Sequence, residues 1–297
     1  MSTVWVDGRL VSSDEPHLRV TDRGFQLGDG IFETLRVRRG VPIEWDEHVA
    51  RLHESAAILA IPLPAAVADR LRGAIRDLLE ATGMVQDAAL RITVTRGQFE
   101  RRGLLPPGWE TVEPTMVVQA FPFAPPSPEL LRRGVRAIMS TLRRDARSPL
   151  AGAKSTSRAD HVFAKLEAER AGADDAIFLT GESLVSEATS ANIFAISGDR
   201  LATPAASAGI LSGTTRTWLL EHASRVIPGL AAEERDMRPE DLETADEAFL
   251  SSSVAGVVPL VELDGRAIGG GRPGSRTERL REGREAWIEA QAGSPAQ

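Results

Sequence analysis

The chain has 297 residues, of which 42% are hydrophobic and 26% charged, a composition typical of a globular protein long enough for two domains. Its net charge of -7 argues against a nucleic-acid partner or an anionic membrane surface, and no apolar run reaches the roughly 18 residues of a membrane span. The absence of cysteine excludes disulfides, thiolate metal sites and a cysteine nucleophile. The start, MSTVWVDGRL, lacks the layout of a signal peptide, so a cytoplasmic protein is expected.

The first 120 residues combine predicted strands with two predicted helices. Asp7 and Gly8 form a strong turn signal, so a hairpin is expected around them. Apolar residues recur at helical spacing over 46–60, and Gly83 is placed to end a second helix. The elements expected in this half are the hairpin over 4–11, helices over 46–60 and 65–83, and strands over 31–37, 90–97 and 115–121.

A proline-rich segment separates the two halves of the sequence. Residues 121–129, FPFAPPSPE, hold four prolines in nine residues, and proline continues neither a helix nor a central strand. We therefore expect one domain over 1–120, an interdomain linker over 121–130, and a second domain over 131–297.

The second half has many short predicted strands joined by turns. That pattern favours a mixed α/β fold with an antiparallel or mixed sheet over a doubly wound parallel sheet. The strands are expected over 134–142, 175–180, 183–188, 191–197, 199–204, 247–253, 257–265 and 266–269, and the helices over 158–172, 214–226 and 277–290.

Lysine is nearly absent from the chain. Of the 35 Lys and Arg residues, only Lys154 and Lys165 are lysines. A GC-rich genome that favours arginine codons is one explanation. A lysine is also required where an amine must form a Schiff base, because arginine stays protonated. Lys165 lies in a strongly helical segment and is expected to face solvent, whereas Lys154 lies in the non-helical segment SPLAGAKSTS and is the candidate nucleophile.

Most other catalytic motifs are missing. The five histidines show no HExxH or paired metal-ligand spacing, so no metal site is expected, and there is no G-x-S-x-G elbow. The sequence AKST mimics the end of a P-loop, but that motif requires glycines where Ser148 and Ala153 stand. A nucleotide-binding phosphotransferase is thus a distant alternative, which ATP-dependent thermal stabilisation would favour.

Several residues could bind a phosphorylated cofactor. Gly213, Thr214 and Thr215 open a predicted helix, and a helix start binds anions, although an ordinary threonine-capped helix explains them equally. Ser252 and Ser253 follow a predicted strand and offer hydroxyl donors, yet a serine run is also typical of a loop.

Two charged residues are further candidates. Arg51 flanks the apolar stripe of the helix over 46–60, so it either extends along the surface or reaches a buried anion. Glu187 lies between a predicted strand and a run of small residues. It could pair with a protonated pyridine nitrogen, and a solvent-exposed glutamate is the ordinary alternative.

Together these residues resemble the fold-type IV pyridoxal 5'-phosphate (PLP) enzymes, also called class IV aminotransferases. The likeness runs in order through DRGFQLGDGIFETLRV, EHVARLHESA, LAGAKSTSRADHVFAKLEAERAGADDAIFL, VSEATSANIF, ILSGTTR and FLSSSVAGVVPL. The resemblance implies a small N-terminal α/β domain, a larger C-terminal pseudo-barrel domain, PLP between them, and a homodimer. It also implies transfer of an amino group between an amino acid or primary amine and a 2-keto acid.

Carried over onto this sequence, the family pattern makes Lys154 the residue that binds PLP as a Schiff base and shuttles the substrate proton. The pattern makes Glu187 the partner of the pyridine nitrogen. The residues implied to bind the phosphate or the substrate carboxylate are Arg51, Thr214, Thr215, Ser252 and Ser253.

The implied substrate-binding residues depart from the family patterns. The chain has no tyrosine, and Ala159 stands where branched-chain aminotransferases place one. D-amino-acid aminotransferases bind a carboxylate with a tyrosine, an arginine and a histidine, whose positions are Phe32, Arg101 and Gly103 here. Arg158 resembles a feature of aminodeoxychorismate lyases, so PLP-dependent elimination of pyruvate, giving 4-aminobenzoate, is the alternative within the family. The substrate-binding candidates are Phe32, Arg101 and Arg158.

Overall fold

The computed structural model describes residues 3–15, 17–101 and 103–293, and the chain divides into two compact units. Unit 1 comprises Met1–Phe123, Ala153–Arg158 and Ala290–Gln297, and unit 2 comprises Ala124–Gly152 and Ala159–Glu289. Unit 1 therefore includes a short segment from the second half of the sequence. The division into domains 1–120 and 131–297 with a linker over 121–130 is kept as a proposal.

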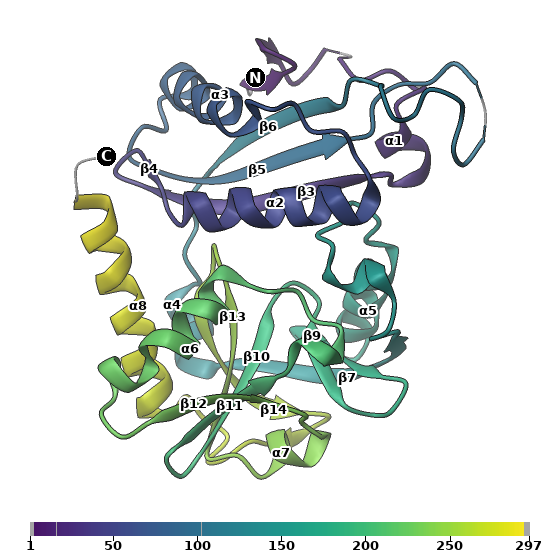
Figure 1. The fold of residues 1–297 in the computed structure, drawn as a ribbon. Coiled ribbons are helices and arrows are strands. Elements are labelled where there is room, and N and C mark those ends of the chain that lie inside the picture. Colours follow the sequence, from purple (N-terminus) through teal and green to yellow (C-terminus); the bar gives the residue numbers. More distant parts are fainter. Residues whose placement is uncertain (1–2, 16, 102, 294–297) are drawn as a thin grey trace. The chain divides into compact units, whose positions relative to one another are not determined.

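Unit 1 is built on a six-stranded sheet (Figure 1). Its strands are β1 (Thr3–Val6), β2 (Arg9–Ser12), β3 (Gly30–Arg38), β4 (Val41–Pro42), β5 (Asp87–Thr95) and β6 (Thr115–Pro122). They pair in the order β2-β1-β6-β5-β3-β4, every pair antiparallel. Every second residue of β5 from Ala88 to Val94 is buried, the alternation expected when one face of a strand packs on a core.

The predicted helices of unit 1 are both present. They are α2 (Trp45–Leu59), which packs on β3, and α3 (Val67–Thr82), which packs on β1 and β6. Leu52 of α2 and Leu71 of α3 are fully buried in one core with the sheet. Gly83 ends α3 in the left-handed conformation, as predicted.

Unit 2 contains a nine-stranded mixed sheet that curls into a half-barrel (Figure 1). Its strands are β7 (Val135–Arg144), β8 (Asp175–Thr180), β9 (Val185–Ala188), β10 (Asn192–Ser197), β11 (Arg200–Pro204), β12 (Ala231–Arg235), β13 (Glu247–Ser252), β14 (Gly256–Leu263) and β15 (Arg266–Ala267). They pair in the order β12-β11-β10-β13-β14-β7-β8-β9, with β15 beside β14. The pairs β11–β12, β14–β7 and β7–β8 are parallel, and the others are antiparallel.

Both faces of the unit 2 sheet are buried. On β13, Leu250 contributes to a core among the strands, while its neighbour Phe249 packs with Phe194 in a second core that also holds Trp218. The helices that cover the sheet are α4 (Pro128–Arg133), α5 (Ala159–Arg170), α6 (Thr214–Val226), α7 (Pro239–Glu243) and α8 (Ser275–Gly293). Short 3-10 turns lie over Pro149–Gly152 and Ala206–Ala208.

Some short elements were not predicted from the sequence. The helices α1 (Arg23–Leu27), α4 and α7 span too few residues to show helical periodicity, and β4 and β12 were also missed. Proline in the expected linker starts α4 rather than preventing a helix. Pro128 occupies the first helical turn, where no N–H is required, and the Ser127 side chain accepts a hydrogen bond from the Leu130 amide.

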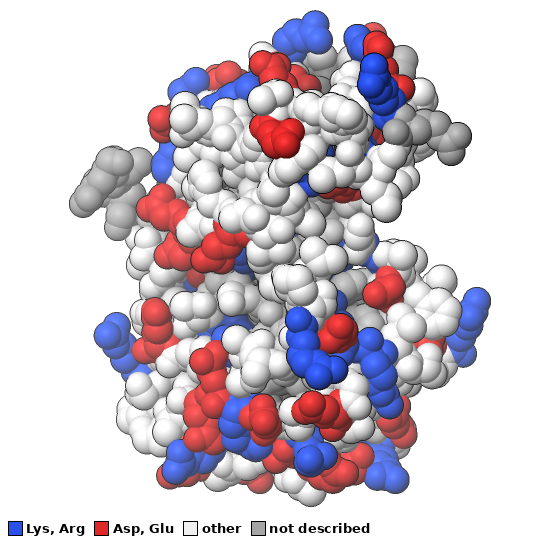
Figure 2. Space-filling view, turned by 45° about the vertical axis from the view of Figure 1, so that its right-hand side comes forward, with Lys and Arg blue, Asp and Glu red and all other residues white. Residues whose placement is uncertain are grey.

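The surface shows no single-sign region on the face drawn in Figure 2, where Lys and Arg residues are interspersed with Asp and Glu residues. Among the described residues, no helix combines the length and the apolar character needed to cross a membrane.

Candidate active site

Lys154 lies in the segment 153–158, which is fixed to the edge of β3 in unit 1. The Phe32 amide donates to the Lys154 carbonyl (2.9 Å), and the Thr156 amide donates to the Gly30 carbonyl (2.9 Å). The Lys154 amide donates to the Ser55 hydroxyl of α2 (3.0 Å). Lys154 is therefore outside any helix, as the sequence predicted, and its backbone is held by β3 and α2.

Three cationic side chains lie around the Phe32 ring. The Lys154 Nζ atom lies 4.8 Å from the ring centroid, and the guanidinium carbons of Arg91 and Arg158 lie 4.0 and 6.0 Å from it. Burial lowers the pKa of Arg91. The structure thus brings together the predicted residues Phe32, Lys154 and Arg158, and it adds Arg91, which the sequence reasoning missed.

Arg51 is buried and forms an ion pair with Glu33. Its Nε and Nη2 atoms donate to the two carboxylate oxygens of Glu33 at 2.9 and 2.6 Å, and His48 Nδ1 lies 2.7 Å from Glu33 Oε2. Burial acts to raise the pKa of Glu33, but the hydrogen bonds from Arg51 and His48 outweigh it and lower the pKa to about 2. Arg51 thus reaches a buried anion, as one interpretation of the sequence held, and that anion is Glu33.

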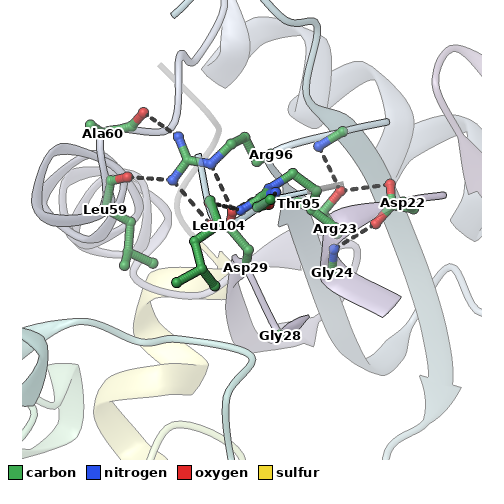
Figure 3. Close-up of polar contacts among 12 residues, drawn as sticks. Asp22, Arg23, Gly24, Gly28, Asp29, Leu59, Ala60, Thr95, Arg96 and Leu104 are labelled. Atoms are coloured by element: carbon green, nitrogen blue, oxygen red, sulfur yellow. Dashed lines mark hydrogen bonds and ion pairs between the residues drawn. The ribbon is translucent and has the colours of Figure 1, made fainter. Parts of the chain in front are cut away.

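A second charged cluster anchors the loop that carries Arg101 (Figure 3). The Asp29 carboxylate accepts from Arg23 (2.7 Å) and Arg96 (2.8 and 3.0 Å), which lower its pKa although burial acts to raise it. Arg96 also donates to the carbonyls of Leu59 and Ala60 at the end of α2. Arg23 also donates to the carbonyls of Gly103 and Leu104, while Arg101 itself is exposed.

Glu187 lies on β9 in unit 2 and is 6% exposed, so it is not the solvent-facing glutamate of the ordinary interpretation. Arg144 of β7 forms an ion pair with its Oε1 atom (3.2 Å), and the Leu211 amide donates to Oε2 (3.0 Å). Arg144 is held in place by a hydrogen bond to the Gly209 carbonyl (2.9 Å). Sequence reasoning missed Arg144, which lies far from Glu187 in the chain.

The start of α6 is the predicted anion site in unit 2. Gly213 precedes the helix, and a Cβ atom there would lie 2.1 Å from the Asn192 Oδ1 atom, so a larger residue would have to displace the Asn192 side chain. Asn192 in turn donates to the Leu211 carbonyl (2.9 Å). Asn192 therefore fixes the loop that leads to α6.

Hydroxyl groups surround this helix start. The Thr214 and Ser253 hydroxyls lie 3.1 Å apart, and the Ser252 hydroxyl accepts from the Ala255 amide (3.3 Å). Thr215 is buried. The Ser251 hydroxyl is also buried and has no hydrogen-bond partner in the part of the chain that the structure describes.

The side chains present fit a phosphorylated aldehyde such as PLP. Unit 2 offers a glycine-preceded helix start with hydroxyl donors for a phosphate and a buried carboxylate for a ring nitrogen. Unit 1 offers the Lys154 amine for an aldehyde. Within residues 3–15, 17–101 and 103–293, no group of three or more His, Asp or Glu residues could hold a metal ion.

Comparison with known proteins shows the family to which the chain belongs. A family model described as "Amino-transferase class IV" matches residues 30–263. The D-alanine aminotransferase of Bacillus licheniformis is 33% identical over 277 residues, covering 93% of this chain and 94% of that protein. The D-alanine aminotransferase of Staphylococcus haemolyticus is 31% identical, covering 98% of this chain and 100% of that protein.

Solved structures match the same length of chain. The branched-chain amino acid aminotransferase of Escherichia coli superimposes with a TM-score of 0.88 at 26% identity, covering 97% of this chain and 94% of that one. The branched-chain aminotransferase of the archaeon Thermoproteus uzoniensis with norvaline gives a TM-score of 0.86 at 28% identity, covering 98% and 95%. Another branched-chain amino acid aminotransferase, solved with pyridoxamine 5'-phosphate, gives a TM-score of 0.88 at 27% identity. The mixed α/β fold expected from the sequence is confirmed.

Proposed function

Since the chain belongs to the class IV aminotransferases, a PLP-dependent family, we propose that it transfers an amino group between an amino acid and a 2-keto acid with Lys154 as the catalytic residue. The observation that carries this assignment is the Lys154 amine beside Phe32, on a segment that β3 and α2 hold in place. Lys165, the other lysine, donates from α5 to the Asp174 carbonyl and serves a structural role.

When bound, PLP supplies an aldehyde that reacts with amines and a ring that withdraws electrons from the substrate's α-carbon. Lys154 would hold the aldehyde until the amine of the substrate replaces it there, and its freed Nζ atom would then serve as the base that accepts the substrate's α-proton and later returns it. The centroid of the Phe32 ring lies 4.8 Å from Nζ, and the ring covers one side of the amine.

Glu187 would hold the pyridine nitrogen of the cofactor. A carboxylate there favours a protonated nitrogen, and Arg144 together with the Leu211 amide fixes its orientation. Thr214, Thr215 and the start of α6 would hold the phosphate, with Ser252 and Ser253 as further donors to the phosphate or the substrate. Arg51 is also proposed to contact the phosphate, while Glu33 holds its guanidinium group in position.

The cations around Phe32 support carboxylate substrates. Arg91 and Arg158 place two guanidinium groups beside the ring that also contacts Lys154, and guanidinium groups bind carboxylates in pairs of hydrogen bonds. A keto acid with a second carboxylate is therefore the favoured acceptor. Arg101, on its exposed loop, stays a proposed substrate residue.

A homodimer is also proposed. Val162, Phe163 and Leu166 expose apolar surface on α5, with side chains 59%, 44% and 47% exposed, and buried apolar area drives association of subunits. Light scattering of the purified protein should give about twice the mass of one chain, 31.9 kDa. A monomer at working concentrations would contradict this proposal without affecting the reaction.

Half-reactions test the proposed function. The PLP-loaded protein is mixed with L-leucine, D-alanine, D-glutamate or (R)-1-phenylethylamine, and loss of the cofactor's visible absorbance is followed. Catalytic turnover should then require an acceptor such as 2-oxoglutarate. Release of pyruvate from aminodeoxychorismate without any acceptor would favour the lyase alternative, which Arg158 suggests, and would contradict transamination.

A further inference from the structure

Arg284 of α8 is a fully buried arginine in unit 2. Its side chain is 1% exposed and is the largest among the fully buried residues described. Removing a guanidinium from water is costly unless its surroundings compensate for the lost hydration. The groups around Arg284 therefore indicate what the buried charge does.

The groups that contact this guanidinium include two indole rings and one hydroxyl. Its central carbon lies 4.6 Å from the centroid of Trp287 and 5.3 Å from that of Trp218, distances at which an aromatic face attracts a cation. Its Nη2 atom donates to the Thr215 Oγ1 atom at 3.5 Å. Thr215 and Trp218 are both on the first turns of α6, so the positive charge of Arg284 lies beside the start of that helix.

The direction of this hydrogen bond has a consequence for Thr215. A hydroxyl has one hydrogen to donate and two lone pairs that accept. Since Arg284 can only donate, the Thr215 oxygen is the acceptor, and the hydroxyl hydrogen stays available for an anion. The adjacent cation also polarises the hydroxyl, which makes it a stronger donor.

We propose that Arg284 is a positioning residue for the phosphate of the cofactor and acts through Thr215. The inference rests on the proposed function, in which the start of α6 holds that phosphate. The charge of Arg284 adds to the positive end of the helix, where N–H groups favour an anion. The other buried arginine of the proposed site, Arg51, contacts the Glu33 carboxylate, whereas Arg284 contacts a hydroxyl at the helix start itself.

Equilibrium binding to the apo-protein separates a phosphate effect from a general one. PLP and pyridoxal, which lacks the phosphate, are titrated while tryptophan fluorescence is recorded. In Arg284→Met, the Kd for PLP should rise at least about tenfold, since hydrogen bonds to charged groups contribute on this scale. The Kd for pyridoxal should stay within about twofold of the unchanged protein.

Arg281→Met is the matched control. Arg281 lies one turn earlier on α8 and pairs with Glu278 of the same helix, so its loss should leave both Kd values unchanged. Arg284→Lys keeps the charge but not the planar group beside the two indoles, and it should weaken PLP binding less than Arg284→Met does. Equal weakening of PLP and pyridoxal, or no weakening of PLP, would overturn the proposal.

Thr215→Val tests whether Arg284 acts through the Thr215 hydroxyl. It also keeps the proposal testable if Arg284→Met does not fold. Valine keeps the shape of threonine but cannot accept from Arg284, so PLP binding should weaken while pyridoxal binding does not. In the Thr215→Val protein, the further change Arg284→Lys should raise the Kd for PLP only slightly, because both changes interrupt the same interaction. Fully additive losses would overturn the proposal. An unchanged protein that binds neither PLP nor pyridoxal would instead contradict the proposed function.

Discussion

The two units use buried charge in different ways. In unit 1, Glu33 lies between Arg51 and His48, and Asp29 lies between Arg23 and Arg96, so each acid contacts two basic side chains. These clusters tie α2, β3 and the loop after β5 to one another. In unit 2, the start of α6 presents amides and hydroxyl groups instead, with Arg284 behind them. The charge clusters of unit 1 therefore mainly join elements of that unit to one another, whereas the donors at the start of α6 in unit 2 are the ones proposed to contact a ligand.

If that contrast holds, changes in unit 1 should mainly alter stability and changes in unit 2 should mainly alter binding or rate. The exceptions are the residues of unit 1 that are proposed to contact the cofactor or the substrate: Lys154 above all, and also Phe32, Arg51, Arg91, Arg101 and Arg158. Lys154→Arg should reduce transamination by at least about 10⁴-fold, since arginine keeps the charge but cannot bind an aldehyde.

The readout for Lys154 is the mass of the protein after borohydride treatment with PLP, together with the rate of turnover. Lys165→Arg is the matched control, because Lys165 is the other lysine of the chain and should not affect either measurement. Covalent labelling that survived in Lys154→Arg would contradict the assignment.

The next largest effect is expected in the Glu33 cluster of unit 1. Glu33→Gln leaves Arg51 and His48 without the carboxylate and should lower the free energy of unfolding by about 3 kcal/mol at pH 7. The pKa of Glu33, about 2, lies below its ordinary value of 4.5. Its contribution is therefore complete above about pH 4.5 and is lost as the pH falls toward 2.

Urea unfolding at several pH values tests the Glu33 prediction. The difference in stability between the unchanged chain and Glu33→Gln should shrink between about pH 4.5 and 2. Glu54→Gln, at an exposed position on α2, the helix that carries Arg51 and His48, should change stability by less than about 0.5 kcal/mol. A constant difference at every pH would mean that the ion pair is not the cause.

In unit 2, Glu187→Gln should reduce kcat about 100-fold, because the carboxylate is proposed to act on the bound ring. It should also lower the stability of the apo-protein, because Arg144 loses its buried partner. Single-turnover kinetics and thermal unfolding of the same samples check both parts. Glu182→Gln changes an exposed glutamate just before β9 and is the control. A large loss of stability with an unchanged rate would reverse the contrast between the units.

The smallest effect is expected for Asp29→Asn in unit 1. It weakens the contacts with Arg23 and Arg96 and should lower stability by about 1–2 kcal/mol. Hydrogen exchange should rise over residues 103–109, which Arg23 anchors. Asp77→Asn, which breaks an exposed pair with Arg76, should alter neither quantity. Faster exchange in both variants would show that the Asp29 cluster does not hold the loop.

Local patterns in the sequence predicted the features that depend on neighbouring residues. The strand and helix periods gave α2, α3 and most strands, and the small residues around Lys154 indicated a non-helical segment. Gly213 marked the start of α6 because glycine before a helix is itself a local signal. Helices such as α1 span five residues, so they contain no period to detect.

Partners distant in the chain could not be predicted in the same way. The rest of β3, the short strand β4 and the first half of α2 lie between Glu33 and Arg51, and nothing in either segment specifies the other. Arg144 and Glu187 meet only because β7 and β9 both flank β8. Arg91 was visible as a polar residue between the apolar Leu90 and Ile92, but its place beside Phe32 depends on how β3 and β5 pair.

The attachment of residues 153–158 to β3 bears on how the protein assembles during synthesis. Because β4 pairs only with the end of β3, at Val37 and Arg38, the edge near Phe32 is available to a segment that is translated much later. Closing a loop of this length is an entropic barrier that short-range contacts do not face. This edge of the N-terminal sheet can therefore be completed only after residues 153–158 have been synthesised. If Lys154 binds the cofactor as proposed, covalent attachment of this vitamin-derived group also belongs to that late stage.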